Sequence, residues 1–515
     1  MGGTRRHLFI CVFLTLSAIQ LSACSSGGGG GDDAGHDDQP SAWQPGVFLP
    51  SDEFANQCSS ALWENNWLRS WSHETYLWYD EIEDRDPAGY ADPTEYFALL
   101  KTEGYTPSGS KKDNFHYSMP TAEWNQQSES GVSVGYGFQW AVFNSNPEQV
   151  YAAYSDSEEW PAEVARGMRV VRIGDVYMSQ VSSQADIDFI NNALWPSAEG
   201  DTHEFEFERG DGTLYTVELT AANVVSDPVP KVDVLEGSGG ERVGYLLFND
   251  HIGTAEKALH DAVTQLWQES IDDLVLDLRY NGGGYLAIAS QLAYMIAGPE
   301  RTKGKAFELM QFNDQHPTHD PVTGEPLKPI PFINVTLGEW ELLGNQSLPS
   351  NQSLPSLNLE RVFVLAGPNT CSASEAIINS LRGVDVEVVL IGSQTCGKPY
   401  GFYPTDNCGT TWFTIQFKGV NDKGFGEYSD GFAPSSDDDG NALVKGCEVA
   451  DDFSHPLGDE NEGRLAVALN YIADGQCATS AAAGFVAQPQ LGVMFSDGKV
   501  VKPAWRQNRI VTLGR

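Results

Sequence analysis

An apolar segment from Leu274 to Leu278, interrupted only by Asp277, constrains the fold of this chain more than any other feature. A continuous apolar run of this kind is typical of a strand in a parallel sheet, because both faces of such a strand are covered. Comparable strand patterns recur at 243–248, 361–365 and 386–391, and helical patterns alternate with them at 255–268, 285–297 and 375–381. This alternation predicts an α/β fold with a core of βαβ units.

Two smaller regions precede this core. Apolar and aromatic residues at helical spacing between about residues 53 and 104 predict a small helical domain. We expect its tryptophans to pack in a core, and a ligand platform is the alternative. From about residue 129 to residue 222, short alternating segments predict strands, with a helix at 187–194 and a hairpin turn at 209–212.

The layout of the second region resembles a PDZ domain. Gly135, Tyr136, Gly137 and Phe138 stand where PDZ domains have their carboxylate-binding loop. Successive backbone N–H groups of a glycine-rich loop can hold a terminal carboxylate, while the bound peptide adds a strand to the sheet. We therefore expect these four residues to bind substrate. A generic small β domain is the alternative.

The first 23 residues have the features of an export signal. Arg5 and Arg6 precede an apolar stretch, Leu8 to Leu16, that is too short to span a membrane. The sequence ending in Ala23-Cys24 resembles the cleavage box of bacterial lipoproteins, which implies that Cys24 carries a lipid. We expect a protein anchored by lipid in the bacterial cell envelope, at the outer membrane and facing the periplasm or the cell surface. The alternative is an ordinary secretory signal with a chance cysteine.

The charge of the chain excludes several partners. Lys and Arg together number 31 and Asp and Glu number 71, which gives a formal net charge of −40. Binding to the phosphate backbone of nucleic acid needs clustered basic residues, so we expect no nucleic-acid partner. A hydrophobic fraction of 41% excludes global disorder. The acidity is best explained as a contribution to solubility.

Three turns carry the residues that suggest chemistry. Each follows an apolar strand: a glycine turn at 277–284, a serine turn at 369–375 and a lysine turn at 392–398. In an open parallel sheet the turns at the carboxyl ends of the strands share one edge. We therefore expect the three turns to meet, with Ser372 at the start of a helix and Lys398 nearby. Taken singly, Ser372 could be a helix cap and Lys398 a surface cation.

The combination is suited to nucleophilic catalysis. A serine hydroxyl needs a base, and a neutral lysine amine can act as one. A lysine normally titrates near 10.4, so this role near neutral pH requires a decrease in its pKa of about 2–3 units, which burial can supply. A tetrahedral oxyanion needs two backbone donors. The candidates are the N–H of Ala373 and that of Gly283 or Gly284.

Together these motifs resemble the C-terminal processing peptidases, also called tail-specific proteases. The resemblance rests on Asp-Leu-Arg-x-Asn-Gly-Gly-Gly at 277–284, Ser-Ala-Ser-Glu at 372–375 and the later Gly-Lys at 397–398. It implies a serine peptidase in which Ser372 is the nucleophile and Lys398 the base, acting on polypeptides without a metal or other cofactor. Glu375 then supports the dyad, and a capping-box acid is the alternative. Because relatives of this family include carriers of apolar ligands, a non-catalytic binding lipoprotein on the same scaffold remains the rival interpretation.

Six cysteines remain if Cys11 is removed with the signal and Cys24 is acylated. An even number in an exported protein indicates up to three disulfides, and the absence of a CxxC pair argues against a zinc ribbon. If Ser372 and Lys398 touch, Cys371 and Cys396 lie on adjoining turns and can form a bridge. This bridge would be a structural staple or a redox gate. Two separate thiols are the alternative.

These interpretations divide the chain into six parts. They are a signal peptide at 1–23, a Gly/Asp-rich tether at 24–48, a helical domain at 49–125, a PDZ-like domain at 126–228, a serine peptidase core at 229–475 and a C-terminal extension at 476–515. The sequence leaves the substrate, the cleavage-site preference and the oligomeric state open.

Overall fold

The computed structural model describes residues 40, 42–143, 149–156, 160–338 and 348–477, together with two short strands at 499–500 and 509–510. Residues Ser41–Arg515 form one compact unit, separate from Met1–Pro40. The predicted export signal, Cys24 and most of the predicted tether lie outside the described residues. No helix in the described part of the chain has the length and apolar character needed to cross a bilayer.

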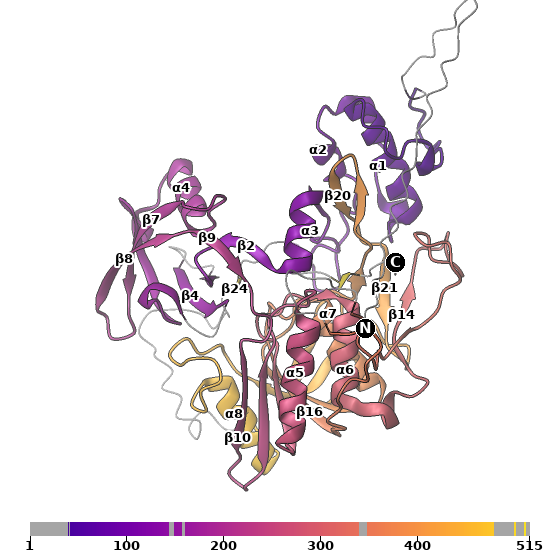
Figure 1. The fold of residues 1–515 in the computed structure, drawn as a ribbon. Coiled ribbons are helices and arrows are strands. Elements are labelled where there is room, and N and C mark those ends of the chain that lie inside the picture. The colour runs from indigo at the N-terminus through magenta and orange to yellow at the C-terminus, as the bar shows by residue number, and fades with distance from the viewer. Residues whose placement is uncertain are drawn as a thin grey trace, which may run out of the picture. The chain divides into compact units, whose positions relative to one another are not determined.

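The core is built on a seven-stranded sheet (Figure 1). Its strand order is β10 (Lys231–Glu236), β11 (Arg242–Leu247), β12 (Asp273–Asp277), β16 (Arg361–Ala366), β17 (Glu387–Gly392), β23 (Leu443–Glu448) and β22 (Ala433–Ser435). All neighbours are parallel except β10 and β11. The predicted βαβ core is therefore confirmed, and its central strands run in the same direction.

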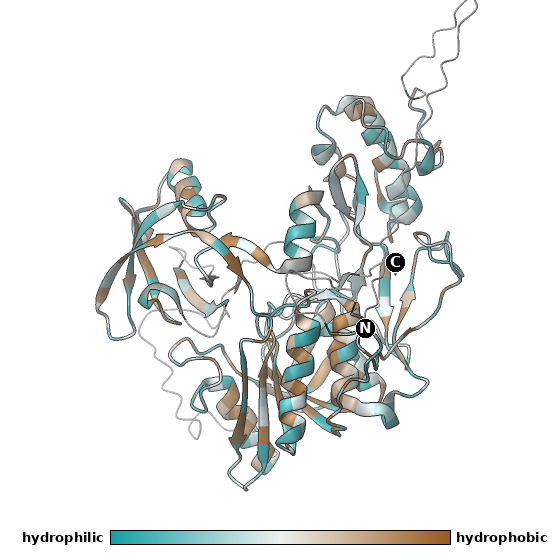
Figure 2. Cartoon of the chain, in the orientation of Figure 1, coloured by the Kyte–Doolittle hydropathy of each residue, from teal (hydrophilic) through white to brown (hydrophobic). Residues whose placement is uncertain are grey.

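Helices cover both faces of this sheet. The helices α5 (Ala255–Gln268), α6 (Leu286–Thr302) and α7 (Ala373–Gly383) pack on one face, and α8 (Gly463–Asp474) packs on the other. Alternate residues of β12 point to opposite faces, with Leu276 toward α5, α6 and α7 and Val275 toward α8. Figure 2 shows the apolar residues concentrated on the sheet and on helix sides that face it. Double-sided burial is the physical reason for the continuous apolar run in this strand.

The N-terminal part is helical, as predicted, and is attached to the core. It contains α1 (Ala61–Thr75), α2 (Pro93–Phe97), the short helices η1 (Ser51–Glu53), η2 (Tyr79–Glu81) and η3 (Pro87–Gly89), then β1 (Tyr117–Pro120) and α3 (Thr121–Ser130). Trp67 and Trp71 stack at 5.0 Å in a buried cluster that also contains Trp412. Trp67 and Trp71 are therefore core residues, whereas Trp63 and Trp78 are only partly buried. The Cys58–Cys408 disulfide ties this part to the hairpin of β19 and β20.

Two small sheets lie beside the core. One has the order β1, β20 (Thr410–Phe413) and β19 (Thr405–Asn407); the other has the order β15 (Ile330–Pro331), β14 (Ala306–Gln311), β21 (Phe417–Val420) and β18 (Tyr400–Gly401). β18 begins two residues after Lys398, so the chain enters the second of these sheets directly after the predicted lysine turn.

A small β domain, defined here as residues 132–225 where described, has its own buried cluster. It contains β2 (Val132–Gly135), β3 (Phe138–Phe143), β4 (Gln149–Ser155), η4 (Pro161–Glu163), β5 (Arg169–Ile173), β6 (Val176–Tyr177), η5 (Met178–Gln180), α4 (Gln184–Leu194), β7 (Thr202–Glu208), β8 (Leu214–Thr220) and β9 (Ala222–Val225). Its sheet order is β24-β3-β4-β5-β7-β8, in which β24 (Lys499–Val500) comes from the C-terminal end of the chain. The predicted strands and the predicted helix are present.

Candidate active site

Three turns meet at one edge of the core sheet. They follow β12, β16 and β17, which are parallel neighbours. The N–H of Cys371 donates to the carbonyl of Asn281 at 3.0 Å, and the N–H of Cys396 donates to the carbonyl of Thr370 at 3.1 Å. The prediction that the glycine, serine and lysine turns share this edge is therefore confirmed.

Ser372 lies immediately before α7 and has an unusual backbone conformation. Its φ is 60° and its ψ is −110°, and the residue is fully buried. A residue that only caps a helix usually has extended backbone angles. A positive φ in a residue with a side chain is costly and persists only where its surroundings impose it, often at functional sites. This conformation distinguishes Ser372 from a simple cap.

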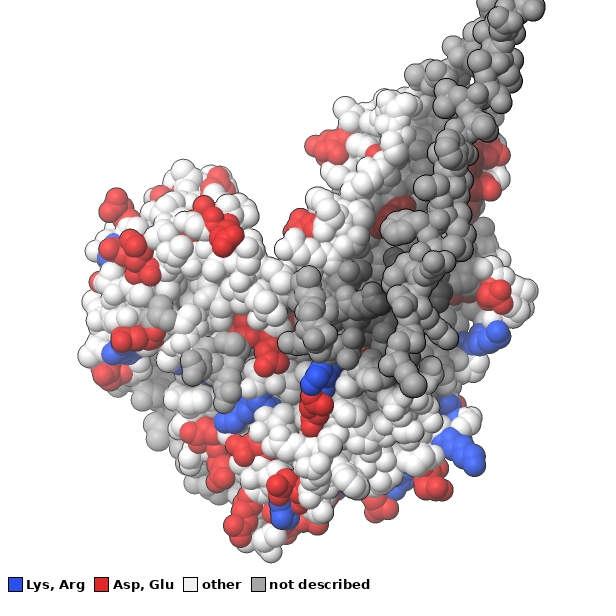
Figure 3. All heavy atoms as spheres, viewed as in Figure 1, with Lys and Arg blue, Asp and Glu red and all other residues white. Residues whose placement is uncertain are grey.

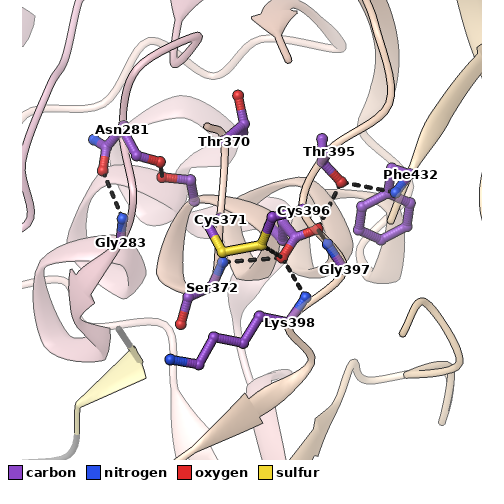
Figure 4. Close-up of a disulfide and its surroundings, with 12 residues drawn as sticks. Asn281, Gly283, Thr370, Cys371, Ser372, Thr395, Cys396, Gly397, Lys398 and Phe432 are labelled. Carbon is purple, nitrogen blue, oxygen red and sulfur yellow. Dashed lines mark hydrogen bonds between the residues drawn. A yellow bond between two sulfur atoms is a disulfide. The ribbon is translucent and has the colours of Figure 1, made fainter. Parts of the chain in front are cut away.

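Lys398 is also fully buried, so the alternative of a surface cation is wrong. Its Nζ lies 4.4 Å from the ring centroid of Phe115 and 5.2 Å from that of Phe402. In Figure 4 the side chains of Ser372 and Lys398 extend from their turns in the same direction. The aromatic rings enclose the amine in surroundings of low polarity.

Phe115 is a site residue that the sequence analysis missed. It precedes β1 in the N-terminal part of the chain, and β1 joins the core by pairing with β20. The contact with Lys398 depends on this tertiary pairing. No local pattern around Phe115 indicates the contact.

Glu375 joins the serine turn to the lysine turn. Its Oε2 accepts hydrogen bonds from the N–H groups of Ser372 at 2.9 Å and Lys398 at 2.8 Å. Its Oε1 accepts from the N–H of Gly397 at 2.9 Å and the hydroxyl of Thr395 at 2.6 Å. Burial raises the pKa of Glu375, and these four donors oppose that rise because they favour the carboxylate. The geometry supports a positioning role, which goes beyond that of a capping acid for α7 alone.

The predicted bridge between Cys371 and Cys396 is present, with the two Cα atoms 5.2 Å apart (Figure 4). The alternative of two separate thiols is therefore wrong. Cys447 and Cys477 form a further pair, so with Cys58–Cys408 there are three disulfides among the described residues. The sulfur atoms of Cys371 and Cys396 lie within 4.8 Å of a Glu375 oxygen, which is a spacing compatible with metal ligands. These residues do not fit a metal ion, because both sulfurs are used by the disulfide.

The glycine turn supplies candidate oxyanion donors with different surroundings. The N–H of Gly283 donates to Oδ1 of Asn281 at 3.0 Å, so this expected donor is already engaged. Gly284 has a φ of 135°, and a Cβ there would lie 2.3 Å from the carbonyl oxygen of His251. Only glycine therefore fits at this position. Ala373, the other expected donor, is the first residue of α7 and is fully buried.

His251 contacts the glycine turn at 277–284 through two hydrogen bonds. The ring Nδ1 of His251 lies 2.9 Å from Oδ1 of Asn281. The backbone N–H of His251 donates to the carbonyl of Gly283 at 3.2 Å. The Asn281 amide in turn donates to the carbonyl of Phe248 at 3.0 Å. His251 is thus a structural residue behind the glycine turn.

The Gly135–Phe138 loop connects β2 to β3 in the small β domain. The Tyr136 hydroxyl donates to the carbonyl of Ala193 at 2.8 Å, and the rings of Tyr136 and Phe138 belong to the domain core. Gly137 has a φ of 84°. The two side chains are therefore structural, and this loop can offer a ligand mainly its backbone.

A buried charge network connects the small β domain to the glycine turn. Arg166 donates to the Tyr280 hydroxyl and to Asp451, both at 2.7 Å. Arg279 donates to Asp451 at 2.9 Å and to Glu462 at 2.7 Å. Burial alone would raise the pKa of Asp451. The nearby guanidinium groups, above all that of Arg166, hold this pKa well below its usual range. Arg279 therefore has a structural role.

Charges on the exposed surface agree with the composition. Figure 3 shows acidic side chains spread over the face in view, with basic side chains scattered among them.

Comparisons with known proteins agree with this geometry. Residues 242–402 match Peptidase family S41, and residues 64–119 match the Peptidase S41 N-terminal domain. The chain is 30% identical over 186 residues to a carboxyl-terminal-processing protease of Picosynechococcus sp. (strain ATCC 27264 / PCC 7002 / PR-6), covering 36% of each chain. It is 25% identical over 132 residues to a chloroplastic C-terminal processing peptidase of Tetradesmus obliquus, covering 25% of this chain and 26% of the relative. The matches therefore span about a third or less of the length of these curated relatives.

The fold has a counterpart among solved structures. The crystal structure of a protein described as an S41 protease from Bacteroides fragilis NCTC 9343 covers 80% of this chain and 97% of its own, with a TM-score of 0.57 at 22% sequence identity. This similarity concerns the fold. The two matching regions show that the chain contains S41 peptidase family domains.

Proposed function

We propose that this protein is a serine endopeptidase that cleaves polypeptides with a Ser372–Lys398 dyad. The observation that carries the proposal is the convergence of the serine and lysine turns, which the Glu375 carboxylate and the Cys371–Cys396 bridge hold together. The match of residues 242–402 to Peptidase family S41 supports the same chemistry.

The reaction follows from the properties of these groups. Neutral Lys398 takes the proton from the Ser372 hydroxyl as the oxygen attacks the substrate carbonyl. The resulting oxyanion accepts hydrogen bonds from the N–H of Ala373 and from the glycine turn, where Gly284 is the better candidate because Gly283 is engaged. Lys398 then gives its proton to the leaving amine. Water hydrolyses the acyl-enzyme with the lysine acting again as base.

The environment of Lys398 suits this role. Burial away from water favours the neutral form of an amine, whereas the faces of Phe115 and Phe402 stabilise the ammonium that forms during the reaction. We therefore expect the rate to rise with pH as the neutral amine becomes more populated. A rate that stays flat from about pH 5 to about pH 10 would argue against a lysine base.

The decisive experiment compares peptidase activity in the wild type and in Ser372→Ala and Lys398→Ala. Both variants should lose cleavage of an unstructured protein such as labelled β-casein while keeping the far-UV circular dichroism of the wild type. If Lys398→Ala keeps more than about a tenth of the activity, a loss below about 1.4 kcal/mol of barrier, the base is misassigned. If the wild type itself does not cleave, the non-catalytic binding function becomes the better explanation.

Two further parts of the proposal concern substrate capture and location. The small β domain acts as a PDZ-like domain that binds an extended or C-terminal segment of the substrate, because β3 follows a glycine loop and is the outermost strand that residues 132–225 contribute to the sheet. The protein is anchored by a lipid on Cys24 in the bacterial outer membrane. Metabolic labelling with a fatty-acid analogue should label the wild type but not Cys24→Ala.

A further inference from the structure

Two short strands from the C-terminal end of the chain pair with the two places where a substrate would bind. β24 (Lys499–Val500) is antiparallel to β3, with Lys499 opposite Val142 and Val500 opposite Ala141. β25 (Arg509–Ile510) is parallel to β13 (Gly284–Tyr285). We call β24 and β25 together the C-terminal strap.

β24 occupies the peptide-binding edge of the small β domain. In the sheet order β24-β3-β4-β5-β7-β8, β3 would be the edge strand if β24 were absent. β3 begins at Phe138, directly after the glycine loop. An added strand here uses the same backbone groups that a bound peptide would use.

β25 lies against the glycine turn of the active site. Its partner β13 contains Gly284, the better oxyanion candidate, and β25 also packs against β18, which begins two residues after Lys398. In Figure 4 a short yellow strand from the C-terminal end of the chain lies on the side toward which the Ser372 and Lys398 side chains extend. The backbone of Arg509–Ile510 thus lies between the oxyanion turn and the strand that follows the base.

We propose that the C-terminal strap is an intramolecular inhibitor that must leave both edges before a substrate can be cleaved. This inference rests on the proposed peptidase function. The fully buried state of Ser372 and Lys398 fits a site that is closed in this structure.

The direction of the chain supports an inhibitor and not a substrate. A substrate whose C-terminal end is captured by a PDZ-like edge presents preceding residues to the nucleophile. Here the order is reversed, because the segment at the small β domain, Lys499–Val500, precedes the segment at the glycine turn, Arg509–Ile510. The strap also offers an internal segment to the small β domain, and not the terminal carboxylate.

Attachment to the same chain makes such a block effective. An attached segment competes at an effective concentration on the order of 1 mM. If the free segment binds with a Kd of about 100 µM, attachment reduces the available sites about tenfold. A substrate that engages both edges can still displace the strap, because each strap strand contributes few backbone hydrogen bonds.

The test uses the full-length protein and a matched pair of substitutions in β25. Ile510→Pro removes the backbone N–H and fixes φ, so it should disrupt pairing with β13. Ile510→Ala removes more of the side chain than Ile510→Pro does but keeps the backbone N–H, so it controls for the loss of side-chain atoms. We expect kcat/KM for labelled β-casein to rise about tenfold in Ile510→Pro and to stay within about twofold of the wild type in Ile510→Ala. Equal rates in all three proteins would overturn the proposal.

A binding experiment separates this inference from the proposed catalysis. The variant Ser372→Ala lacking residues 499–515 is titrated with a fluorescent peptide of residues 496–515, and anisotropy is measured. We expect saturable binding that unlabelled peptide of the same sequence displaces, and binding about tenfold weaker to Ser372→Ala with its C-terminal end intact. Binding of this kind supports the strap even if no variant cleaves casein, in which case only the peptidase function fails.

Two outcomes would overturn the strap. One is a catalytically active protein whose shortened Ser372→Ala form does not bind the peptide. The other is steady loss of the C-terminal residues from the wild type but not from Ser372→Ala, measured by intact mass. That loss would make the segment a substrate.

Discussion

Removing the Cys371–Cys396 disulfide should reduce both stability and activity, and the chain contains a matched control. The bond closes a loop of sequence separation 25, and Cys447–Cys477 closes one of separation 30. The loop-entropy relation gives nearly equal contributions, about 3.5 kcal/mol for the first and about 3.6 kcal/mol for the second. Any difference between their effects on activity therefore reflects location and not loop size.

Location distinguishes the two bonds sharply. Cys371 precedes Ser372, and Cys396 lies two residues before Lys398. Cys447 lies in β23, and its partner Cys477 follows α8. We expect the double variant Cys371→Ala/Cys396→Ala to lose at least about tenfold in kcat, because a shift of about 1 Å at reacting groups has effects of this order or larger. Cys447→Ala/Cys477→Ala should keep kcat within about twofold.

The assay measures Tm by scanning calorimetry and kcat on labelled β-casein, without reductant. Both double variants should show a decrease in Tm of about 3–4 °C, because an unfolding entropy of about 2.1 cal/mol/K per residue amounts to about 1 kcal/mol/K for the unit Ser41–Arg515. An equal decrease in Tm with unchanged kcat in both variants would refute the idea that the bridge organises the active site. It would leave Cys371–Cys396 as a staple only.

Three further outcomes test other parts of the site. Glu375→Gln should lower the free energy of unfolding by about 3 kcal/mol, because the amide turns a donor toward N–H groups that need an acceptor. It should also reduce kcat more than Thr395→Val, which removes one of the four donors to Glu375. Equal kcat in the two variants would contradict the positioning role. Burial lowers the pKa of His116 to about 4, so the unfolded chain binds a proton at higher pH than the folded chain does. The free energy of unfolding should therefore fall by about 1.4 kcal/mol per pH unit as the pH falls from about 6.5 to about 4. A plot of Tm against pH should have a shallower slope in His116→Phe. Gly137→Val should weaken cleavage of casein more than cleavage of a short peptide, because a φ of 84° is strained for valine. The space for the added Cβ is adequate, since its nearest neighbour is Pro161 at 3.5 Å. Equal losses on both substrates would remove the small β domain from substrate recognition.

Much of the core and the dyad could be predicted from the sequence because the signals are local. The apolar run Leu274–Leu278 indicates a strand covered on both faces, and parallel strands must place their following turns at one edge. That rule is sufficient to bring Ser372 near Lys398 and to predict the bridge between Cys371 and Cys396, which is present. Each of these predictions follows from a strand and the turn after it.

Contacts between distant segments were decided only by the tertiary structure. The Phe115 ring over Lys398 depends on β1 pairing with β20, and the Arg166 network depends on how the small β domain packs on the core. The strap is the clearest case, because a two-residue strand carries no detectable pattern of its own. Its backbone hydrogen bonds can be made by any sequence, so only the folded chain determines which edge it occupies.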